Sequence, residues 1–214
     1  MSIITIERKV LEKNDQIAAE NRALLARHGI FAFNLVSSPG SGKTSLLEKT
    51  FDHLAGTVKA AVIEGDVQTD LDAQRVAKFN VPTVQIVTAG GCHLEANLVR
   101  DALNNLDLSA VKLLVIENVG NLVCPSNYDL GEAMKVVVAS TTEGDDKPLK
   151  YPAMFRNASV MIVNKIDLLP YINCNIGVLR ANALRINPAL RIFETACTTG
   201  AGIPEWCAWI REQL

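Results

Sequence analysis

Short apolar runs recur along the chain and alternate with segments of helical periodicity. The runs are rich in Val, Ile, Leu and Phe, and they lack strict apolar/polar alternation, which is typical of strands buried on both faces. Seven runs are predicted to be strands: FAFNLV (31–36), KAAVIE (59–64), TVQIV (83–87), VKLLVIEN (111–118), KVVVAS (135–140), SVMIVNK (159–165) and LRIFETA (190–196).

Helical patterns lie between most of these strands. They are SLLEKTFDHL (45–54), LDAQRVAKF (71–79), HLEANLVRDALNNL (93–106) and GVLRANALRI (177–186). This repeated strand–helix–strand order predicts an α/β fold of three layers, with a mostly parallel central sheet and helices on both faces. The first ~28 residues resemble a charged amphipathic helix, so we expect an N-terminal helical extension (1–30) before one domain (31–214). Ligands of such a sheet bind at the carboxyl ends of its strands.

The segment FNLVSSPGSGKTSLLEK (33–49) contains the end of a phosphate-binding loop. The pattern G-x-x-x-x-G-K-[ST] would start with glycine at position 37, where the chain has Ser37. The loop still joins a predicted strand to a predicted helix, so its backbone N–H groups can face an anion, and position 37 should not need a positive φ. We predict a P-loop NTPase fold in which Lys43 reaches the β- and γ-phosphates and the Thr44 hydroxyl binds Mg²⁺. The residues predicted to contact the nucleotide here are Gly40, Ser41, Gly42, Lys43, Thr44 and Ser45.

Two acidic residues are predicted at the same carboxyl edge. Asp66 follows the second strand, and Glu117 ends the fourth. The segment ENVG (117–120) resembles the D-x-x-G switch of GTPases with Glu in place of Asp, and there the glycine N–H can sense the γ-phosphate. We predict that Thr44, Asp66 and Glu117 bind magnesium. The residues predicted to be catalytic are Lys43, Asp66 and Glu117. Asp66 can either hold the magnesium shell or orient the attacking water. Asp70 and Asp72 follow in the same segment, and one of them can cap a helix.

The segment VMIVNKIDLLP (160–170) indicates which base is bound. Asp167 of the N-K-x-D pattern can accept hydrogen bonds from guanine N1–H and the 2-amino group, whereas adenine would leave this carboxylate unpaired. Lys165 can lie over the base, and Asn164 can connect this loop to the phosphate loop. The later sequence Thr195, Ala196 and Cys197 resembles the S-A-K loop of GTPases, with Cys197 in the third place. We therefore predict a site for GTP and GDP.

Composition excludes several other classes of function. The 214 residues are 49% apolar and 21% charged with a net charge of -2, which argues against a nucleic-acid surface. No apolar run approaches the ~20 residues of a membrane span, and the charged N-terminus is unlike a signal peptide, so we predict a cytoplasmic protein without a membrane partner. The five cysteines are odd in number and irregularly spaced, which argues against a disulfide framework. We expect Cys207 to be buried in a helix and Cys174 to have no role.

Three side chains suggest a transition-metal site. Cys92 and His93 follow the third strand, and Cys124 comes seven residues after Glu117, so both segments leave the predicted nucleotide edge. Cys and His are ligands for Zn²⁺ and Ni²⁺. Three ligands do not complete a tetrahedral site, but a two-fold dimer would supply six. The alternative is two buried thiols and a histidine at a helix start.

These motifs together resemble one family. The segments SSPGSGKTSLLEKT, IEGDVQTDLDAQR, GGCHLEANLV, IENVGNLVCPSNYDLGE, EGDDKPLKYP and VNKIDLLPY are similar to the GTPase that incorporates nickel into NiFe hydrogenases. The resemblance implies a slow GTPase that forms a GTP-dependent homodimer in the SIMIBI class of P-loop GTPases, with an interfacial Ni²⁺ or Zn²⁺ site at Cys92, His93 and Cys124. It also implies nickel delivery to a hydrogenase large-subunit precursor with a small zinc-containing partner protein. Neither the N-terminal cysteine motif nor the histidine-rich tract of some relatives is found in this sequence.

Three alternatives remain open on the residues. A urease nickel GTPase would carry Cys-Pro-His as a contiguous motif, whereas here Cys92 and His93 are separated from Cys124. A GTPase chaperone of cobalamin-dependent enzymes would not need the cysteines, and a nucleotide-independent metal-binding module would not need an intact phosphate loop.

The charged segment TTEGDDKPLKYP (141–152) is either a solvated loop or one whose Lys147 or Lys150 reaches the partner subunit's nucleotide.

Overall fold

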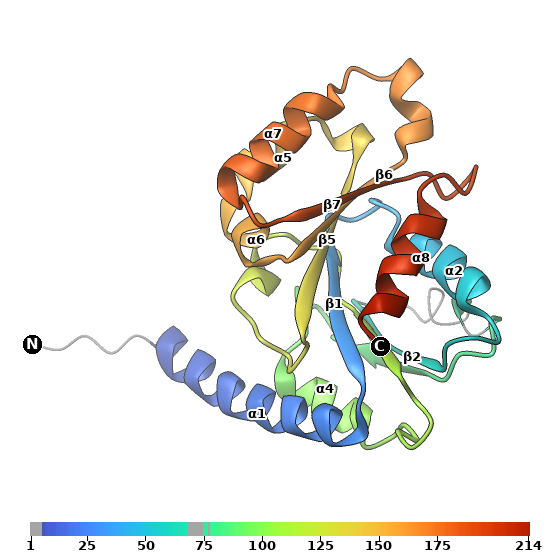
Figure 1. Ribbon diagram of the computed structural model, residues 1–214. Coiled ribbons are helices and arrows are strands. Elements are labelled where there is room, and N and C mark those ends of the chain that lie inside the picture. Colours follow the sequence, from blue (N-terminus) through green and yellow to red (C-terminus); the bar gives the residue numbers. More distant parts are fainter. Residues whose placement is uncertain (1–5, 68–74, 77) are drawn as a thin grey trace, which may run out of the picture.

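Seven parallel strands form one sheet in the computed structural model, which describes residues 6–67, 75, 76 and 78–214 (Figure 1). The strand order is β3-β2-β4-β1-β5-β6-β7, so the chain starts in the middle of the sheet and builds outward on both sides. The strands are β1 (Phe31–Ser37), β2 (Ala60–Asp66), β3 (Thr83–Val87), β4 (Leu113–Glu117), β5 (Met134–Ser140), β6 (Val160–Asn164) and β7 (Arg191–Thr195). All seven predicted strands and the three-layer α/β class are confirmed.

Helices cover both faces of this sheet (Figure 1). The described helices are α1 (Ile6–His28), α2 (Lys43–Leu54), α4 (Ala96–Leu103), α5 (Lys147–Lys150), α6 (Pro152–Asn157), α7 (Ile176–Ile186) and α8 (Ile203–Glu212). Short 3₁₀ turns are η1 (Cys124–Ser126), η2 (Thr141–Glu143) and η3 (Ile166–Tyr171). Most of the helix predicted over 71–79, and with it Asp70 and Asp72, lies outside the described residues.

The helix predicted over 93–106 is shorter than expected. Helix α4 begins at Ala96, and the residue before it, Glu95, is extended with φ −113° and ψ 158°. The backbone N–H of Leu94 donates to the side chain of Asn118, and that of Ala96 donates to the side chain of Asn14. Side chains from elsewhere in the chain therefore satisfy these N–H groups, and the segment that carries Cys92 and His93 stays outside the helix.

Side chains of the strands alternate between the two faces of the sheet, because successive residues of a strand point in opposite directions. Phe33 and Leu35 of β1 pack on the face covered by α2 and α8. Ala32 packs on the opposite face toward α1 and α4, and Val36 packs there toward α6 and α7. The continuous apolar runs of the sequence reflect this burial on both sides.

Aromatic rings fill the layer between the sheet and α8. Trp206 and Trp209 stack with ring centroids 5.2 Å apart, and Phe33 meets Trp206 edge-on at 5.7 Å. The indole N–H of Trp206 donates to the hydroxyl of Thr50 in α2 at 3.0 Å. Cys207 is buried here, as predicted, and burial raises the pKa of its thiol to about 12.

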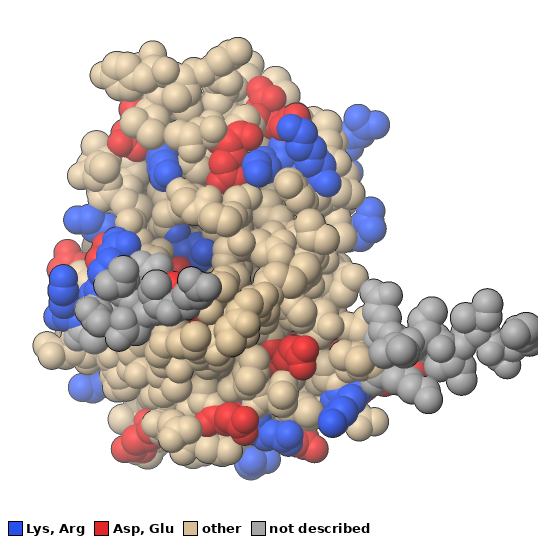
Figure 2. All heavy atoms as spheres, turned by 180° about the vertical axis from the view of Figure 1, so that it is seen from behind, with Lys and Arg blue, Asp and Glu red and all other residues tan. Residues whose placement is uncertain are grey.

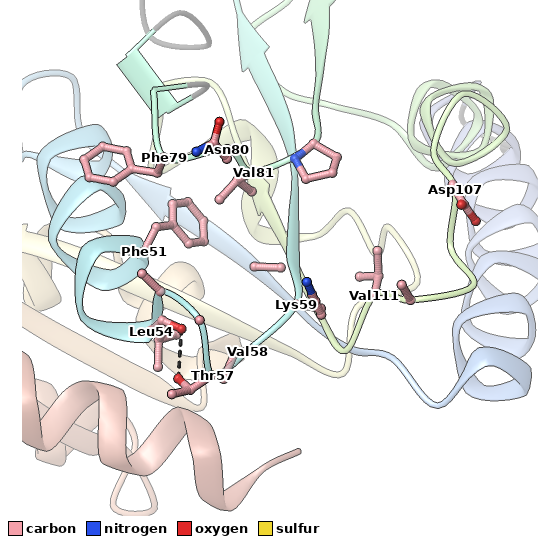
Figure 3. Close-up of a pocket in the computed structure, with 15 residues that line it drawn as sticks. Phe51, Leu54, Thr57, Val58, Lys59, Phe79, Asn80, Val81, Asp107 and Val111 are labelled. Carbon is pink, nitrogen blue, oxygen red and sulfur yellow. Dashed lines mark hydrogen bonds between the residues drawn. The ribbon is translucent and has the colours of Figure 1, made fainter.

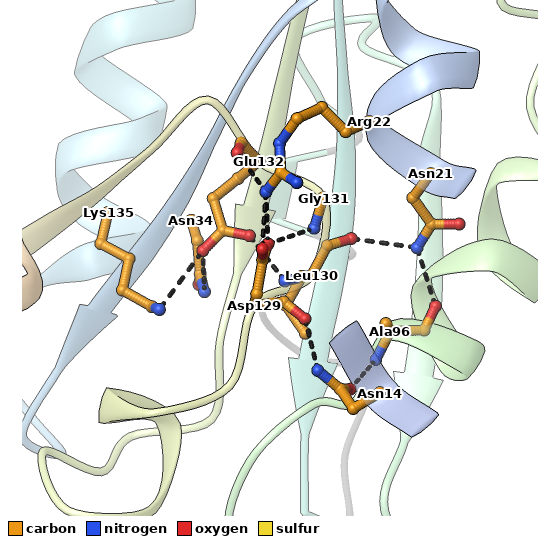
Figure 4. Close-up of polar contacts among 10 residues, drawn as sticks. All are labelled: Asn14, Asn21, Arg22, Asn34, Ala96, Asp129, Leu130, Gly131, Glu132 and Lys135. Carbon is orange, nitrogen blue, oxygen red and sulfur yellow. Dashed lines mark hydrogen bonds and ion pairs between the residues drawn. The ribbon is translucent and has the colours of Figure 1, made fainter. Parts of the chain in front are cut away.

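The N-terminal helix α1 packs against α4 on the other face. Figure 4 shows how polar side chains fasten it there. Asn21 donates to the carbonyl groups of Ala96 and Leu130, at 2.8 and 3.0 Å, and Arg22 makes two contacts of 2.6 and 2.7 Å with the carboxylate of Asp129. Asn21 is 1% exposed, and its two hydrogen bonds hold α1 against two separate segments.

On the face seen in Figure 2, acidic and basic side chains are interspersed. Among the described helices, none combines the length and the apolar character that a bilayer crossing would need.

Candidate nucleotide and metal site

The phosphate loop lies between β1 and α2 and ends in a left-handed glycine. Gly42 has φ 97° and stands directly before the first residue of α2, Lys43. Ser37, at the position of the missing glycine, does not have a positive φ, so the prediction for this position is confirmed. Its buried hydroxyl accepts a hydrogen bond from Lys43 Nζ at 3.1 Å and donates to the Ser38 carbonyl at 2.6 Å. Ser37 thus holds the lysine in place in a way that a glycine could not.

An acidic hollow lies beside this loop. Thr44 Oγ1 donates to Glu117 Oε1 at 3.1 Å, and Lys43 Nζ lies 3.8 Å from the same oxygen. A hollow of about 270 Å³ is lined by Lys43, Asp66, Glu117 and Gly120, among others. One hydroxyl and several carboxylates form the kind of oxygen donor set that suits Mg²⁺. The structure therefore brings together the side chains predicted for magnesium.

Sequence reasoning missed one acid in this hollow. Glu64 is 1% exposed, lines the hollow and is paired in register with Glu117 across β2 and β4. It lies two residues before Asp66 in the strand, and this spacing was the signal from which its position in the hollow could have been predicted. The switch glycine also fits closely, since a Cβ atom on Gly120 would lie 3.0 Å from Pro39 Cα.

The base loop is joined to the phosphate loop by two side chains. Asn164 Nδ2 donates to the Ser41 carbonyl at 3.0 Å, which is the connection predicted for it, and Lys165 Nζ donates to the Gly40 carbonyl at 2.7 Å. Thr195 Oγ1 donates to Asn164 Oδ1 at 3.1 Å, and Cys197 Sγ lies 3.5 Å from that oxygen. Burial raises the pKa of Cys197, so its thiol stays protonated beside the amide.

Asp167 is held by a neighbour that sequence analysis did not name. Thr198 Oγ1 donates to Asp167 Oδ2 at 2.6 Å. Thr198 follows Cys197 directly, so the loop that contains Thr195, Ala196 and Cys197 also orients the carboxylate predicted to read guanine. The sequence signal was the hydroxyl one residue beyond the S-A-K-like triplet.

The charged segment after β5 meets the phosphate loop of its own chain. Lys147 Nζ donates to Ser38 Oγ at 3.1 Å and forms an ion pair with Glu143 Oε2 at 3.2 Å, and Glu143 Oε1 accepts from the Ser41 hydroxyl. Lys150 instead pairs with Asp146 at 2.7 Å on the surface. Lys147 is therefore not in a simple solvated loop.

Cys92, His93 and Cys124 come together as predicted. Their ligand atoms all lie within 4.8 Å of one another, and Cys92 Sγ is 3.5 Å from His93 Nδ1. Hydrogen bonding to Cys124, together with burial, raises the pKa of Cys92, while burial lowers the pKa of His93 and so favours its neutral, metal-binding form. The ring of His93 lies against Tyr128, with centroids 4.0 Å apart. Among the described residues, no other group of three or more His, Cys, Asp or Glu side chains brings its ligand atoms this close together.

A larger hollow of about 520 Å³ lies at the opposite, amino edge of the sheet (Figure 3). Phe51, Val81 and Val111 line it together with the backbone at the start of β2. None of the residues predicted for nucleotide or metal lines this hollow, so its size does not make it the candidate site.

Comparisons with known proteins agree with this arrangement. Residues 31–194 match the family model "CobW/HypB/UreG, nucleotide-binding domain". The hydrogenase maturation factor HypB of Azotobacter vinelandii is 52% identical over 211 residues, which cover 99% of this chain and 70% of that protein. The hydrogenase/urease maturation factor HypB of Helicobacter pylori is 43% identical, covering 89% and 79%. The crystal structure of Helicobacter pylori HypB in complex with nickel superposes with a TM-score of 0.90 at 40% identity, covering 94% of each chain. The chain therefore belongs to the CobW/HypB/UreG family of nucleotide-binding proteins and, within it, to the HypB hydrogenase maturation factors.

Proposed function

We propose that the protein is a GTP-hydrolysing metallochaperone that delivers nickel during maturation of NiFe hydrogenases. The observation that carries this proposal is the proximity of the two sites. Asn121 follows Gly120 of the switch, and its Nδ2 donates to the carbonyl of Cys92 at 3.3 Å. The segment beside the γ-phosphate position thus touches the segment that carries the metal ligands. The nickel complex of the Helicobacter pylori relative supports nickel as the cargo.

Nucleotide hydrolysis is assigned to the acidic hollow. Thr44, Asp66 and Glu117 would hold Mg²⁺, which when bound would neutralise charge on the phosphates. Lys43 stabilises negative charge at the β- and γ-phosphates, and Asp66 orients the attacking water. Gly40, Ser41, Gly42 and Ser45 offer backbone N–H groups and hydroxyls to the phosphates. Turnover is slow, because the motif set contains no arginine finger at a known position.

Guanine is recognised by the base loop. Asp167 accepts from N1–H and the 2-amino group, with its orientation set by Thr198. Lys165 covers the base plane, while Asn164 keeps the loop attached to Ser41. Thr195, Ala196 and Cys197 form the other side of the base pocket.

Nickel binds through Cys92, His93 and Cys124, and Zn²⁺ suits the same ligands. Three ligands per chain leave the shell incomplete, so a GTP-dependent homodimer would bring a second set to the same place. The delivery step involves a small zinc-containing partner protein and the hydrogenase large-subunit precursor, in the cytoplasm. The name of the Helicobacter pylori relative supports a urease precursor as a second client.

Metal titration with the nucleotide state fixed tests this function. Ni²⁺ is added to protein loaded with GDP and to protein loaded with a non-hydrolysable GTP analogue in Mg²⁺, and affinity, stoichiometry and oligomeric state are measured. We expect dimer formation and a changed nickel affinity with the analogue. Cys124→Ser should lose nickel yet hydrolyse GTP at the normal rate, whereas Cys174→Ser should match wild type. Identical nickel binding in both nucleotide states, or retained nickel in Cys124→Ser, would refute the proposal.

A further inference from the structure

Asn118 is a buried amide at the junction of the nucleotide switch and the metal-binding segment. It lies between Glu117 and Gly120 in sequence and is 1% exposed. Its Oδ1 accepts hydrogen bonds from the backbone N–H of Leu94 at 3.1 Å and from that of Val119 at 3.0 Å. Leu94 directly follows His93. One oxygen atom therefore joins the backbone of the switch to the backbone beside a metal ligand.

The other half of the amide is fixed as well. Asn118 Nδ2 donates to Asn34 Oδ1 in β1 at 3.2 Å, and Asn34 Nδ2 donates to Glu132 Oε1 at 3.3 Å (Asn34 and Glu132 are drawn in Figure 4). Rotating the Asn118 amide by half a turn would point its N–H groups at two N–H donors and its oxygen at another oxygen. Such a flip would leave buried polar atoms unpaired, so the orientation of Asn118 is fixed.

The residues that follow His93 are held by two different parts of the molecule. The side chain of Leu94 packs so closely on Gly65 that a Cβ atom there would lie 2.8 Å from Leu94 Cδ1, and Gly65 stands between Glu64 and Asp66 in the acidic hollow. Two residues later, Ala96 N–H donates to Asn14 and its carbonyl accepts from Asn21, both on α1. Leu94 is thus attached to the nucleotide hollow, while Ala96 is attached to a helix that does not line that hollow.

We propose that Asn118 is the positioning residue that transmits the nucleotide state to the metal ligands, an inference that rests on the coupled function proposed above. When the switch segment moves with the γ-phosphate, Asn118 carries Leu94 with it and so displaces His93 and Cys92 relative to Cys124. Asn121 also touches this segment, but it is only half-buried, and its single 3.3 Å contact lies in an exposed environment. The buried bond of Asn118 is shielded from water and is the stiffer connection.

The coupling factor tests the proposal. It is the ratio of Ni²⁺ dissociation constants in the GDP state and in the GTP-analogue state, and by reciprocity it equals the factor by which nickel changes the affinity for the analogue relative to that for GDP. Couplings of this kind are typically about 5- to 150-fold. We expect Asn118→Ala to bring the factor to within about twofold of unity while nickel and GDP each still bind. Asn118→Ser, which keeps a polar atom but is too short to reach Leu94, should do the same and serves if the alanine variant does not fold.

Asn21→Ala is the matched control, because Asn21 is equally buried and bonds to Ala96 of the same segment but not to the switch. It should lower the unfolding temperature yet keep the wild-type coupling factor, and Asn121→Ala should keep most of it. Wild-type coupling in both Asn118 variants, or its loss in Asn21→Ala as well, would overturn the assignment to Asn118. If wild type itself shows no coupling, the proposed function fails with it.

Discussion

The hydroxyl of Thr44, at the start of α2, donates a hydrogen bond to the carboxylate of Glu117, at the end of β4, over 3.1 Å. These residues are 73 positions apart, and their contact joins the phosphate loop to the switch segment. Lys43 lies 3.8 Å from the same carboxylate oxygen, so a cation and a hydroxyl already converge on it.

Replacing Lys43 should remove most of the catalysis. In Lys43→Ala we expect GTP turnover to fall by roughly 10²- to 10³-fold, as when a preorganised donor is lost from the transition state, and triphosphate affinity to weaken. Lys49→Ala, at an exposed position of the same helix, should leave turnover unchanged. Phosphate release under saturating GTP and Mg²⁺ measures both, and normal turnover in Lys43→Ala would contradict the phosphate-loop assignment.

Asp167→Asn should exchange guanine for xanthine. Asparagine presents one acceptor and one donor, which match N1–H and the 2-oxo group of xanthine but not the 2-amino group of guanine. Leaving a polar group unpaired costs about 1–3 kcal/mol, so GTP affinity should fall roughly 5- to 150-fold while XTP affinity rises. Competition binding with both nucleotides measures the exchange, with Asp101→Asn on α4 as the control. A GTP affinity within about twofold of wild type would mean that Asp167 does not contact the base.

Gly42→Ala should disrupt the connection between the phosphate and base loops. A Cβ atom at Gly42 would lie 2.5 Å from Asn164 Nδ2, whereas at Gly40 nothing lies within 4 Å, and both glycines have positive φ. The left-handed backbone costs an alanine about 1–2 kcal/mol at either position. Only Gly42→Ala should also displace Asn164, so its unfolding free energy should drop further than that of Gly40→Ala. Equal losses for the two variants in urea denaturation would contradict this explanation.

The stability that Asp129 contributes should disappear in acid. Burial acts to raise the pKa of Asp129, but hydrogen bonds from Arg22 and the Gly131 N–H outweigh it and hold the pKa below 3.8. A lowered folded-state pKa means that the contribution is complete above the unfolded value and is lost as the pH falls through the folded value. The unfolding free energies of wild type and Asp129→Asn should therefore differ by a constant amount above about pH 5 and converge below about pH 4. Urea denaturation across this range measures the difference. Asp52→Asn, at an exposed site, is the control. If the difference in unfolding free energy between wild type and Asp129→Asn grew as the pH fell, the predicted direction of the effect would be wrong.

Local sequence signals predicted the sheet and most of the nucleotide site. Each strand is an apolar run, and both nucleotide motifs stand directly after strands, so the rule that parallel strands share a carboxyl edge places Lys43, Glu117 and Asp167 on one side of the molecule. Asn164 could be assigned its contact with the phosphate loop because the motif fixes its distance from the end of β6. The same rule placed the segments of Cys92, His93 and Cys124 at this edge, whereas the three residues as one metal site were implied by the resemblance to the nickel GTPase family.

The remaining contacts depend on pairings that sequence patterns do not encode. Asn14 and Asn21 lie in a helix of ordinary charged appearance, and nothing local shows that their amides replace backbone partners of Ala96. The late start of the helix predicted over 93–106 depends on the amides of Asn14 and Asn118. Sequence alone does not decide between the two alternatives for Lys147, because its contact with Ser38 spans 109 residues.

The stacked indoles of α8 determine which structural change the intrinsic tryptophan fluorescence of this protein reports. The chain has two tryptophans, and both belong to this pair. Trp206 contacts α2 through Thr50, and neither indole lies in the candidate nucleotide or metal site. Because the rings are 0% and 5% exposed, their emission should be blue-shifted in the native state and shift to longer wavelength only when the α2–α8 layer opens. Intrinsic fluorescence is therefore a signal for the opening of this layer and not for local changes at the candidate nucleotide and metal sites.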